Sequence, residues 1–249
     1  MRAGWAVVVC AAVAGGLGCD NHLPKAKPSA GPTVARAGEH HRPERLAHAF
    51  LSVVFGLEYG SRHNDSHRVK KYVGEVRFLV VDETTRGRRD AAEAFLKTLP
   101  GRIRNLRASV VDDPARANFR VYLVDQTAFH DTVRRVLRAD ALAMGAQCIV
   151  GVQTVEGRIL ASTAVIAADD DYLFDRCLVE EVLQGLGPMN DNDGLVESVF
   201  NDTSRHSTFN QFDAALLNML YHPAIRPGMT GVEVQAALPG VMHDLGLAH

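Results

Sequence analysis

The segment at 171–187 constrains the fold of this chain most strongly, because it combines an apolar helical pattern with a compact polar group. The aspartates at 169–171 can cap the first turn of a helix and suit the positive end of its dipole. Two glycines and a proline at 185–188 stop the helix at its other end. Apolar side chains cover most of its circumference: Phe174, Leu178, Val179, Val182, Leu183 and Leu186. The pattern therefore predicts a helix that is buried in the core.

Glu180, Glu181 and Gln184 form the polar group of this helix. On a period of 3.6 residues Glu180 and Gln184 stack on one face, and Glu181 lies on its shoulder beside Cys177. Carboxylates are rarely placed in a buried helix unless they are paired, bound to a ligand or used chemically. We therefore take these three residues as the candidate site and expect them to face a groove.

Charge and hydropathy exclude several classes of protein. The chain has 249 residues, of which 27 are basic and 29 acidic, so it lacks the positive field that gathers nucleic acid. No stretch after the N-terminus is long and apolar enough to span a bilayer. The length allows one sizeable core, or a core with a small appendage.

Residues 1–19 are predicted to be a secretory signal. Arg2 supplies the positive start, and a short apolar run follows at 5–14. The end of this segment, 16–20, resembles the lipobox of bacterial lipoproteins, although Gly16 stands where leucine is usual. The resemblance implies that Cys19 carries lipid and anchors the protein to a membrane of the cell envelope, on the periplasmic side. Asp20 resembles the signal that keeps such proteins on the inner membrane. Ordinary cleavage near Gly18, which leaves Cys19 as a plain thiol, is the alternative.

The rest of the chain divides into a tether and one domain. Residues 20–43 contain prolines, glycines and charges with few large apolar residues, which predicts a flexible tether. Residues 44–249 are predicted to form a single α+β domain, with a mixed sheet packed on helices that lie on one side. The expected elements are a helix at 44–59, a strand at 69–81, helices at 88–106 and 126–137, strands at 118–125, 148–153 and 158–167, and helices at 209–221 and 232–238.

Two further cysteines follow the tether, Cys148 at the start of a strand and Cys177 in the second turn of the buried helix. In an oxidising compartment we expect them to form a disulfide with each other. Such a bond would lock the helix to the sheet. The alternative is two buried free thiols.

The polar group has the register of a zincin-type peptidase site. Those enzymes hold zinc through two histidines four residues apart, and a glutamate after the first histidine takes a proton from the bound water. Glu181 stands at the position of that general base, and Gly187 matches a glycine found downstream in some of these sites. Both histidines are replaced, by Glu180 and Gln184, and Asn190 stands at the position of the third ligand.

Several motifs together resemble a bacterial family of exported proteins and lipoproteins. That family is described only as having a domain of unknown function, the 2927th of its series. The similarity spans about Leu46 to Leu238 and implies an exported, zincin-like domain with no established activity. The motifs that carry it are Cys177–Gly187 with its Glu-Glu-x-x-Gln core, Asn190–Asp191, Ser198–Asp202, Leu220–Pro223 and Pro227–Met229.

The side chains near the helix suit oxygen-preferring metals better than zinc, which favours nitrogen and sulfur ligands. The candidate ligand set for calcium, magnesium or manganese is Glu180, Gln184, Asp191 and Asp202, with His206 as a nitrogen ligand. The sequence does not identify the cofactor, and it also allows roles in which these residues bind no metal. Glu180 and Gln184 can form a buried hydrogen-bonded pair, Asp191 a turn, and His206 a solvated loop position.

Three functions remain from the sequence. The first is a divergent hydrolase acting on envelope peptides, with Glu181 as general base and a divalent metal or Gln184 orienting the water. The second is a catalytically inactive zincin-like module that binds a peptide or an envelope partner through the same cleft. The third is a lipid-tethered structural protein in which the polar group only holds the core together. All three rest on fold analogy more than on the site itself.

Overall fold

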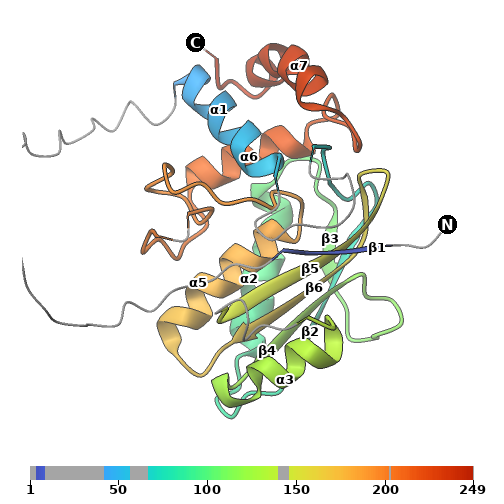
Figure 1. The fold of residues 1–249 in the computed structure, drawn as a ribbon, viewed down its shortest axis with the longest axis vertical. Helices are drawn as coiled ribbons and strands as arrows, with labels where there is room; N and C mark the ends of the chain where they lie inside the picture. Colours follow the sequence, from blue (N-terminus) through green and yellow to red (C-terminus); the bar gives the residue numbers. More distant parts are fainter. Residues whose placement is uncertain (1–3, 9–41, 57–66, 140–145, 202, 249) are drawn as a thin grey trace, which may run out of the picture.

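The computed structural model describes residues 4–8, 42–56, 67–139, 146–201 and 203–248. They form one α+β domain around a mixed sheet of order β1-β5-β6-β4-β2-β3 (Figure 1). The strands are β1 (Gly4–Val8), β2 (Val76–Asp82), β3 (Ala108–Val110), β4 (Phe119–Val124), β5 (Cys148–Val155) and β6 (Arg158–Ala167). The helices are α1 (Pro43–Val54), α2 (Arg89–Arg102), α3 (Gln126–Val136), α5 (Asp171–Gln184), α6 (Gln211–Tyr221) and α7 (Gly231–Asp244). The predicted α+β class with a mixed sheet is confirmed.

Parallel and antiparallel strands occupy different parts of the sheet. β3, β2, β4 and β6 are parallel neighbours, and α2 forms the crossover between β2 and β3. β5 and β6, both predicted as strands, form an antiparallel hairpin with Glu156 and Gly157 in its turn. β1 pairs antiparallel with the outer edge of β5. This strand lies inside the segment that the sequence predicts to be a secretory signal, and the signal stays a prediction.

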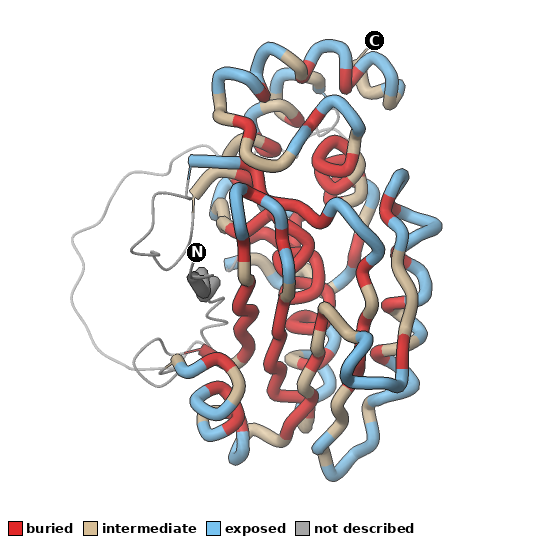
Figure 2. Tube along the Cα trace, turned by 90° about the vertical axis from the view of Figure 1, so that its right-hand side faces the viewer, coloured by how far each residue is buried: buried red, intermediate tan, exposed pale blue. Residues whose placement is uncertain are grey.

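Helices cover both faces of the sheet, so the expectation of helices on one side is wrong. On one face Val150 and Ile166 belong to the main core together with α5. On the other face Ile149 and Val165 pack in a second cluster with Phe129 of α3. The physical reason is that β5 and β6 are apolar at successive positions, and successive side chains point to opposite faces. The central strands are accordingly buried along most of their length (Figure 2).

Three helices, α1, α6 and α7, pack against one another in a layer that closes the main core (Figure 1). Thr230 caps α7 through a reciprocal pair of hydrogen bonds with Glu233, as its sequence position predicts. Within the described ranges, no helix combines the length and apolar character needed to cross a bilayer. Residues 9–41, which include Cys19 and most of the tether predicted at 20–43, lie outside the described residues.

Candidate functional site

Helix α5 carries the candidate site and begins and ends where its sequence signals place it. The side chain of Asp170 accepts a hydrogen bond from the backbone N–H of Leu173 at 2.9 Å, which satisfies a donor of the first turn. Gly185 follows the last helical residue. From Phe174 to Gln184 every residue except Asp175 is buried. The prediction of a buried helix is confirmed.

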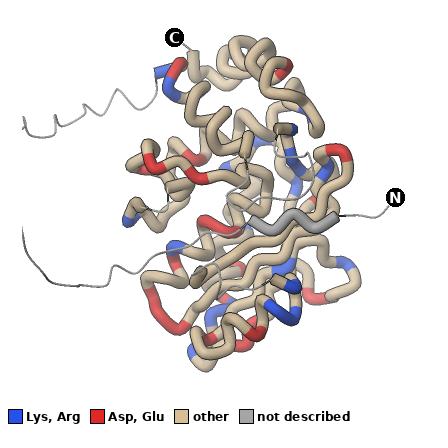
Figure 3. The backbone as a smooth tube through the Cα atoms, viewed as in Figure 1, with Lys and Arg blue, Asp and Glu red and all other residues tan. Residues whose placement is uncertain are grey.

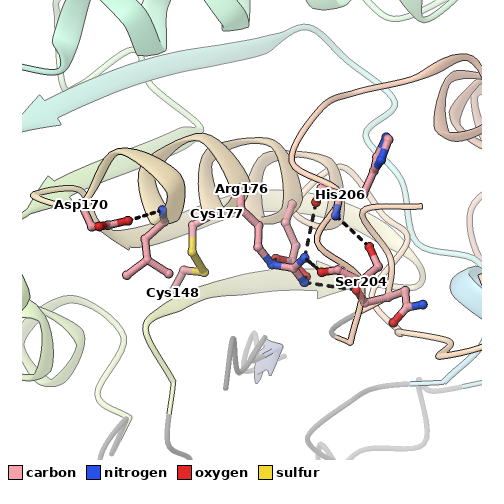
Figure 4. The surroundings of a disulfide bond; sticks show 9 residues. Cys148, Asp170, Arg176, Cys177, Ser204 and His206 are labelled. Atoms are coloured by element: carbon pink, nitrogen blue, oxygen red, sulfur yellow. Dashed lines mark hydrogen bonds and ion pairs between the residues drawn. A yellow bond between two sulfur atoms is a disulfide. The ribbon is translucent and has the colours of Figure 1, made fainter. Parts of the chain in front are cut away.

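A disulfide bonds α5 to the sheet. Cys148 at the start of β5 is joined to Cys177 in the second turn of α5, with their Cα atoms 5.9 Å apart (Figure 4). Neither cysteine is exposed. The predicted pairing is therefore confirmed, and the alternative of two free thiols is wrong. The bond fixes the first half of α5 over β5 and so positions the polar residues of its second half.

Arg176 and Glu180 form an ion pair inside the protein. The Nε atom of Arg176 lies 3.3 Å from Oε2 of Glu180, and its Nη2 atom lies 3.4 Å from Oε1. The two side chains are 2% and 1% exposed, so solvent hardly screens their attraction. The pair spans one helical turn, the spacing at which side chains of a helix meet. The charge of Glu180 is therefore balanced from within α5 itself.

The same guanidinium holds a loop against the helix. Nη2 of Arg176 donates to the backbone carbonyl of Asn201 at 3.2 Å, and Nη1 donates to those of Ser204 and, at 3.4 Å, His206 (Figure 4). Charged donors strengthen such bonds. Arg176 thus connects α5 with the loop at 201–206. Arg176 was not among the candidate residues predicted from the sequence, although an arginine four positions before a buried glutamate is a signal for such a pair.

Gln184, one further turn along the same face, faces Asp191. Its Nε2 atom lies 3.1 Å and 3.3 Å from the two carboxylate oxygens of Asp191, which is half-buried. The neighbouring Asn190 donates to the carbonyl of Ser52 at 2.9 Å and so attaches this turn to the end of α1. One interpretation of the sequence was that Glu180 and Gln184 are partners of each other. The structure gives each of them a different partner, Arg176 for Glu180 and Asp191 for Gln184.

Glu181, the predicted general base, is fully buried in α5. It lies one turn after Cys177, as the helical period predicts. Its position next to Glu180 places two carboxylates at consecutive residues of a helix that packs on β5 and β6. All three predicted polar residues are thus brought into the core, where a charge has a large effect on stability and on reactivity.

The described residues contain only part of the predicted metal set. No group of three or more histidine, cysteine, aspartate or glutamate side chains that could hold a metal ion occurs among them. Glu180 is bound to the arginine cation, which would repel a second cation at the same carboxylate. The ring of His206 contacts Asn210 at 3.0 Å and points away from Arg176 (Figure 4). Asp202 lies outside the described residues, so its predicted role stays a prediction.

The segment just before the loop at 201–206 is attached to α6 through Asp213, whose contribution to stability depends on pH. Ser198 donates to the buried Asp213 carboxylate at 2.6 Å. Burial raises the pKa of Asp213 to about 6, against a usual value near 3.9 for an exposed aspartate. Between these values the folded protein binds more protons than the unfolded chain, so the contribution of Asp213 is fully present below about pH 4 and is lost as the pH rises through about 6.

We expect Asp213→Asn to flatten the pH dependence of the free energy of unfolding between about pH 4 and pH 6. The amide keeps an oxygen that can accept from Ser198 but carries no buried charge. At pH 7 the variant should be more stable than the wild type by about 3 kcal/mol. Urea denaturation at pH 4, 5, 6 and 7 measures both effects. An unchanged slope in the variant would contradict the assignment.

Comparison with known proteins identifies the family. Residues 43–240, most of the chain and nearly all of the described domain, match the family described as "Protein of unknown function (DUF2927)". No curated protein and no solved structure matches the chain. The matched range includes α5, the disulfide and the loop that Arg176 holds. The chain therefore belongs to the DUF2927 family.

Proposed function

We propose that this protein is a lipid-anchored protein of the cell envelope whose zincin-like domain binds an extended peptide segment of a partner without hydrolysing it. The predicted signal and Cys19 support the anchor and a position of the domain on the periplasmic side. The register of Glu180, Glu181 and Gln184 supports the relation to zincin-type domains. The contacts of these residues support binding over catalysis.

Two of the three polar residues of α5, Glu180 and Gln184, have partners that hold the fold together. In a peptidase of this type the residue at 180 must offer a ligand to a metal, but here its carboxylate balances the guanidinium of Arg176. The residue at 184 directs its amide nitrogen at Asp191. Zinc has few favourable ligands in such a set. These contacts tie α5 to the segments at 191 and 201–206, which is a structural role.

The observation that carries the proposal is the outer edge of β5. Five consecutive residues of the chain, Gly4–Val8, pair antiparallel with Val150–Thr154 along this edge. If residues 1–19 are removed on export, the backbone groups of that edge lose their partner. An open sheet edge accepts an extended peptide through main-chain hydrogen bonds, and alternate side-chain pockets give specificity. The disulfide holds α5 beside this strand.

A synthetic peptide with the sequence of residues 1–10 tests this function. The chain from Asp20 onward keeps all of the described core, which begins at Leu46, and is therefore expected to fold without the N-terminal segment. Trp5 is the only tryptophan of the protein, so the peptide fluoresces against a domain without tryptophan. We expect a saturable fluorescence change on binding, with slower hydrogen exchange of the amides at 150–154.

The control is the same peptide with proline in place of Ala6, because proline removes a backbone donor and cannot continue a paired strand. We expect at least tenfold weaker binding of this control. Equal binding of the two peptides, or no binding of either, would contradict the proposal.

The hydrolase is the second candidate, because Glu181 keeps the register of a general base and is fully buried. Mass spectrometry of the incubated peptide separates the two functions. Intact peptide supports the binding module. Cleavage by the wild type that is lost in Glu181→Gln, with an unchanged melting temperature, would replace it with the hydrolase.

A further inference from the structure

A second surface of the domain, remote from α5 along the chain, contains a pocket of about 830 Å³. It lies where three segments meet: residues 68–73, the turn of the β5–β6 hairpin, and the stretch from 226 to the start of α7. The three segments each contribute one arginine, namely Arg68, Arg158 and Arg226. Basic and acidic positions gather at this end of the hairpin (Figure 3). We refer to this site as the arginine pocket.

Two of the three guanidinium groups are available for a ligand. Arg68 donates to the carbonyl of Gly228 at 2.9 Å. Arg158 and Arg226 are exposed, and neither side chain has a hydrogen bond or ion pair with another described residue. Glu156 and Glu233 also line the pocket, but the Glu233 carboxylate accepts from the N–H and hydroxyl of Thr230 at 2.7 and 2.8 Å. The balance of charge in the pocket is positive.

Contacts within the protein fix the backbone that forms the pocket. Gly157, at the tip of the hairpin, has φ +77°, and a Cβ atom there would lie 2.2 Å from the backbone nitrogen of Gly228. The two turns are therefore in direct backbone contact. Lys71 anchors the first segment, since its Nζ atom donates to the carbonyls of Leu220 and Ile225, each at 2.7 Å. A rigid arrangement lowers the entropy that binding would otherwise cost.

Exposed aliphatic side chains occur beside the residues that line the arginine pocket. Of the six large apolar side chains that are exposed in the described part of the chain, one lines the pocket and three lie within two residues of a lining residue in the sequence. Val73 lines the pocket and is 61% exposed, and Val232, beside Glu233, is 77% exposed. Leu160 lies two residues after Arg158 on β6, so both side chains leave the same face of the sheet. The fourth is Val155, next to the hairpin turn.

We propose that this surface docks the domain onto a membrane, with the arginine pocket binding the phosphate of an anionic phospholipid. The guanidinium fork matches the geometry of phosphate oxygens and is less strongly hydrated than an ammonium group. The aliphatic side chains around it enter the boundary between headgroups and acyl chains. Arginines near an anionic leaflet add to this attraction. The proposal stands independently of the peptide-binding function, since it uses none of the residues of α5 or of the β5 edge.

The experiment compares two double variants in the chain from Asp20 onward, which lacks Cys19 and so carries no lipid there. Arg158→Gln/Arg226→Gln removes the two available guanidinium groups. Arg134→Gln/Arg138→Gln removes the same charge from exposed positions at α3 and the residues that follow it. Binding is measured by sedimentation with vesicles of phosphatidylglycerol and phosphatidylcholine, and with vesicles of phosphatidylcholine alone. Equal melting temperatures establish that all proteins are folded.

We expect the pocket variant to bind the anionic vesicles about thirtyfold more weakly than the wild type, and the α3 variant less than threefold more weakly. A Val73→Trp reporter, the only tryptophan in this chain, should shift its emission to the blue with the anionic vesicles only. Equal losses of vesicle binding in the two double variants would overturn the proposal, because they would indicate an unspecific attraction between basic residues and the anionic membrane. Binding of inorganic phosphate without binding to vesicles would overturn it as well, in favour of a free phosphate as ligand.

Discussion

Replacing Arg176 with methionine is expected to lower the free energy of unfolding by about 3–5 kcal/mol, which is the usual cost of breaking a buried ion pair. The substitution leaves the Glu180 carboxylate 1% exposed without its arginine. It also removes the donor that the carbonyls of Asn201, Ser204 and His206 share. Chemical denaturation monitored by far-UV circular dichroism measures the loss. Hydrogen exchange should show the largest increase in the loop at 201–206.

The matched control for this experiment is Arg89→Met. Arg89 and Glu93 have the same one-turn spacing and the same order on α2, but Arg89 is 46% exposed and the pair is 3.6 Å apart. Its loss is expected to cost less than about 1 kcal/mol. The double variant Arg176→Met/Glu180→Leu should recover part of the stability, because the buried carboxylate is gone while the loop carbonyls still lack a donor. Equal effects of Arg176→Met and Arg89→Met would contradict the structural role of the ion pair.

The sequence predicts most of the elements because their periodicity is local. The hairpin at Glu156–Gly157 and the limits of α5 follow from turn and cap residues within a few positions of one another. The placement of α3 on the opposite face does not follow in this way. β5 and β6 have apolar residues on both faces, so their pattern alone does not say which helix covers which face. β3 is only three residues long and has no periodicity from which it could be predicted.

In the candidate site, too, some features follow from neighbouring residues and others depend on distant parts of the chain. The burial of Glu180, Glu181 and Gln184 follows from the apolar residues around them on the helix. The partners of Arg176 depend on where the chain returns at 201–206, which no spacing within α5 determines. The arginine pocket is a further case, because Arg68, Arg158 and Arg226 are far apart in the sequence. Only the tertiary fold brings such residues together.

The ion pair of Arg176 and Glu180 bears on function because both charges stabilise the fold. A hydrolytic site needs groups that change protonation or bind a reacting atom, whereas Glu180 is fixed by Arg176. The Arg176→Met variant therefore also informs the choice between the proposed functions. If the variant loses stability but still binds the peptide of residues 1–10, the β5 edge and the polar group act separately. That outcome is expected when the peptide pairs with the backbone of β5 alone.

Removing the disulfide is the second change with a large expected effect. Cys148→Ala/Cys177→Ala opens a loop defined by a sequence separation of 29 residues. In the chain-entropy description, closing a loop of this length restricts the unfolded chain and contributes about 3–4 kcal/mol to stability. We therefore expect the variant to lose about that much free energy of unfolding. Urea denaturation of the oxidised wild type and of the double variant measures the difference.

Reduction of the wild-type protein separates the contribution of loop closure to stability from that of side-chain packing. The reduced chain keeps both sulfur atoms in the core, where Cys148 and Cys177 are fully buried, whereas the alanine variant loses them and leaves small cavities. If loop closure dominates, the reduced protein and the alanine variant should be destabilised by similar amounts. A reduced protein as stable as the oxidised one would show instead that packing alone holds α5 on β5. The disulfide would then not be what positions Glu180, Glu181 and Gln184.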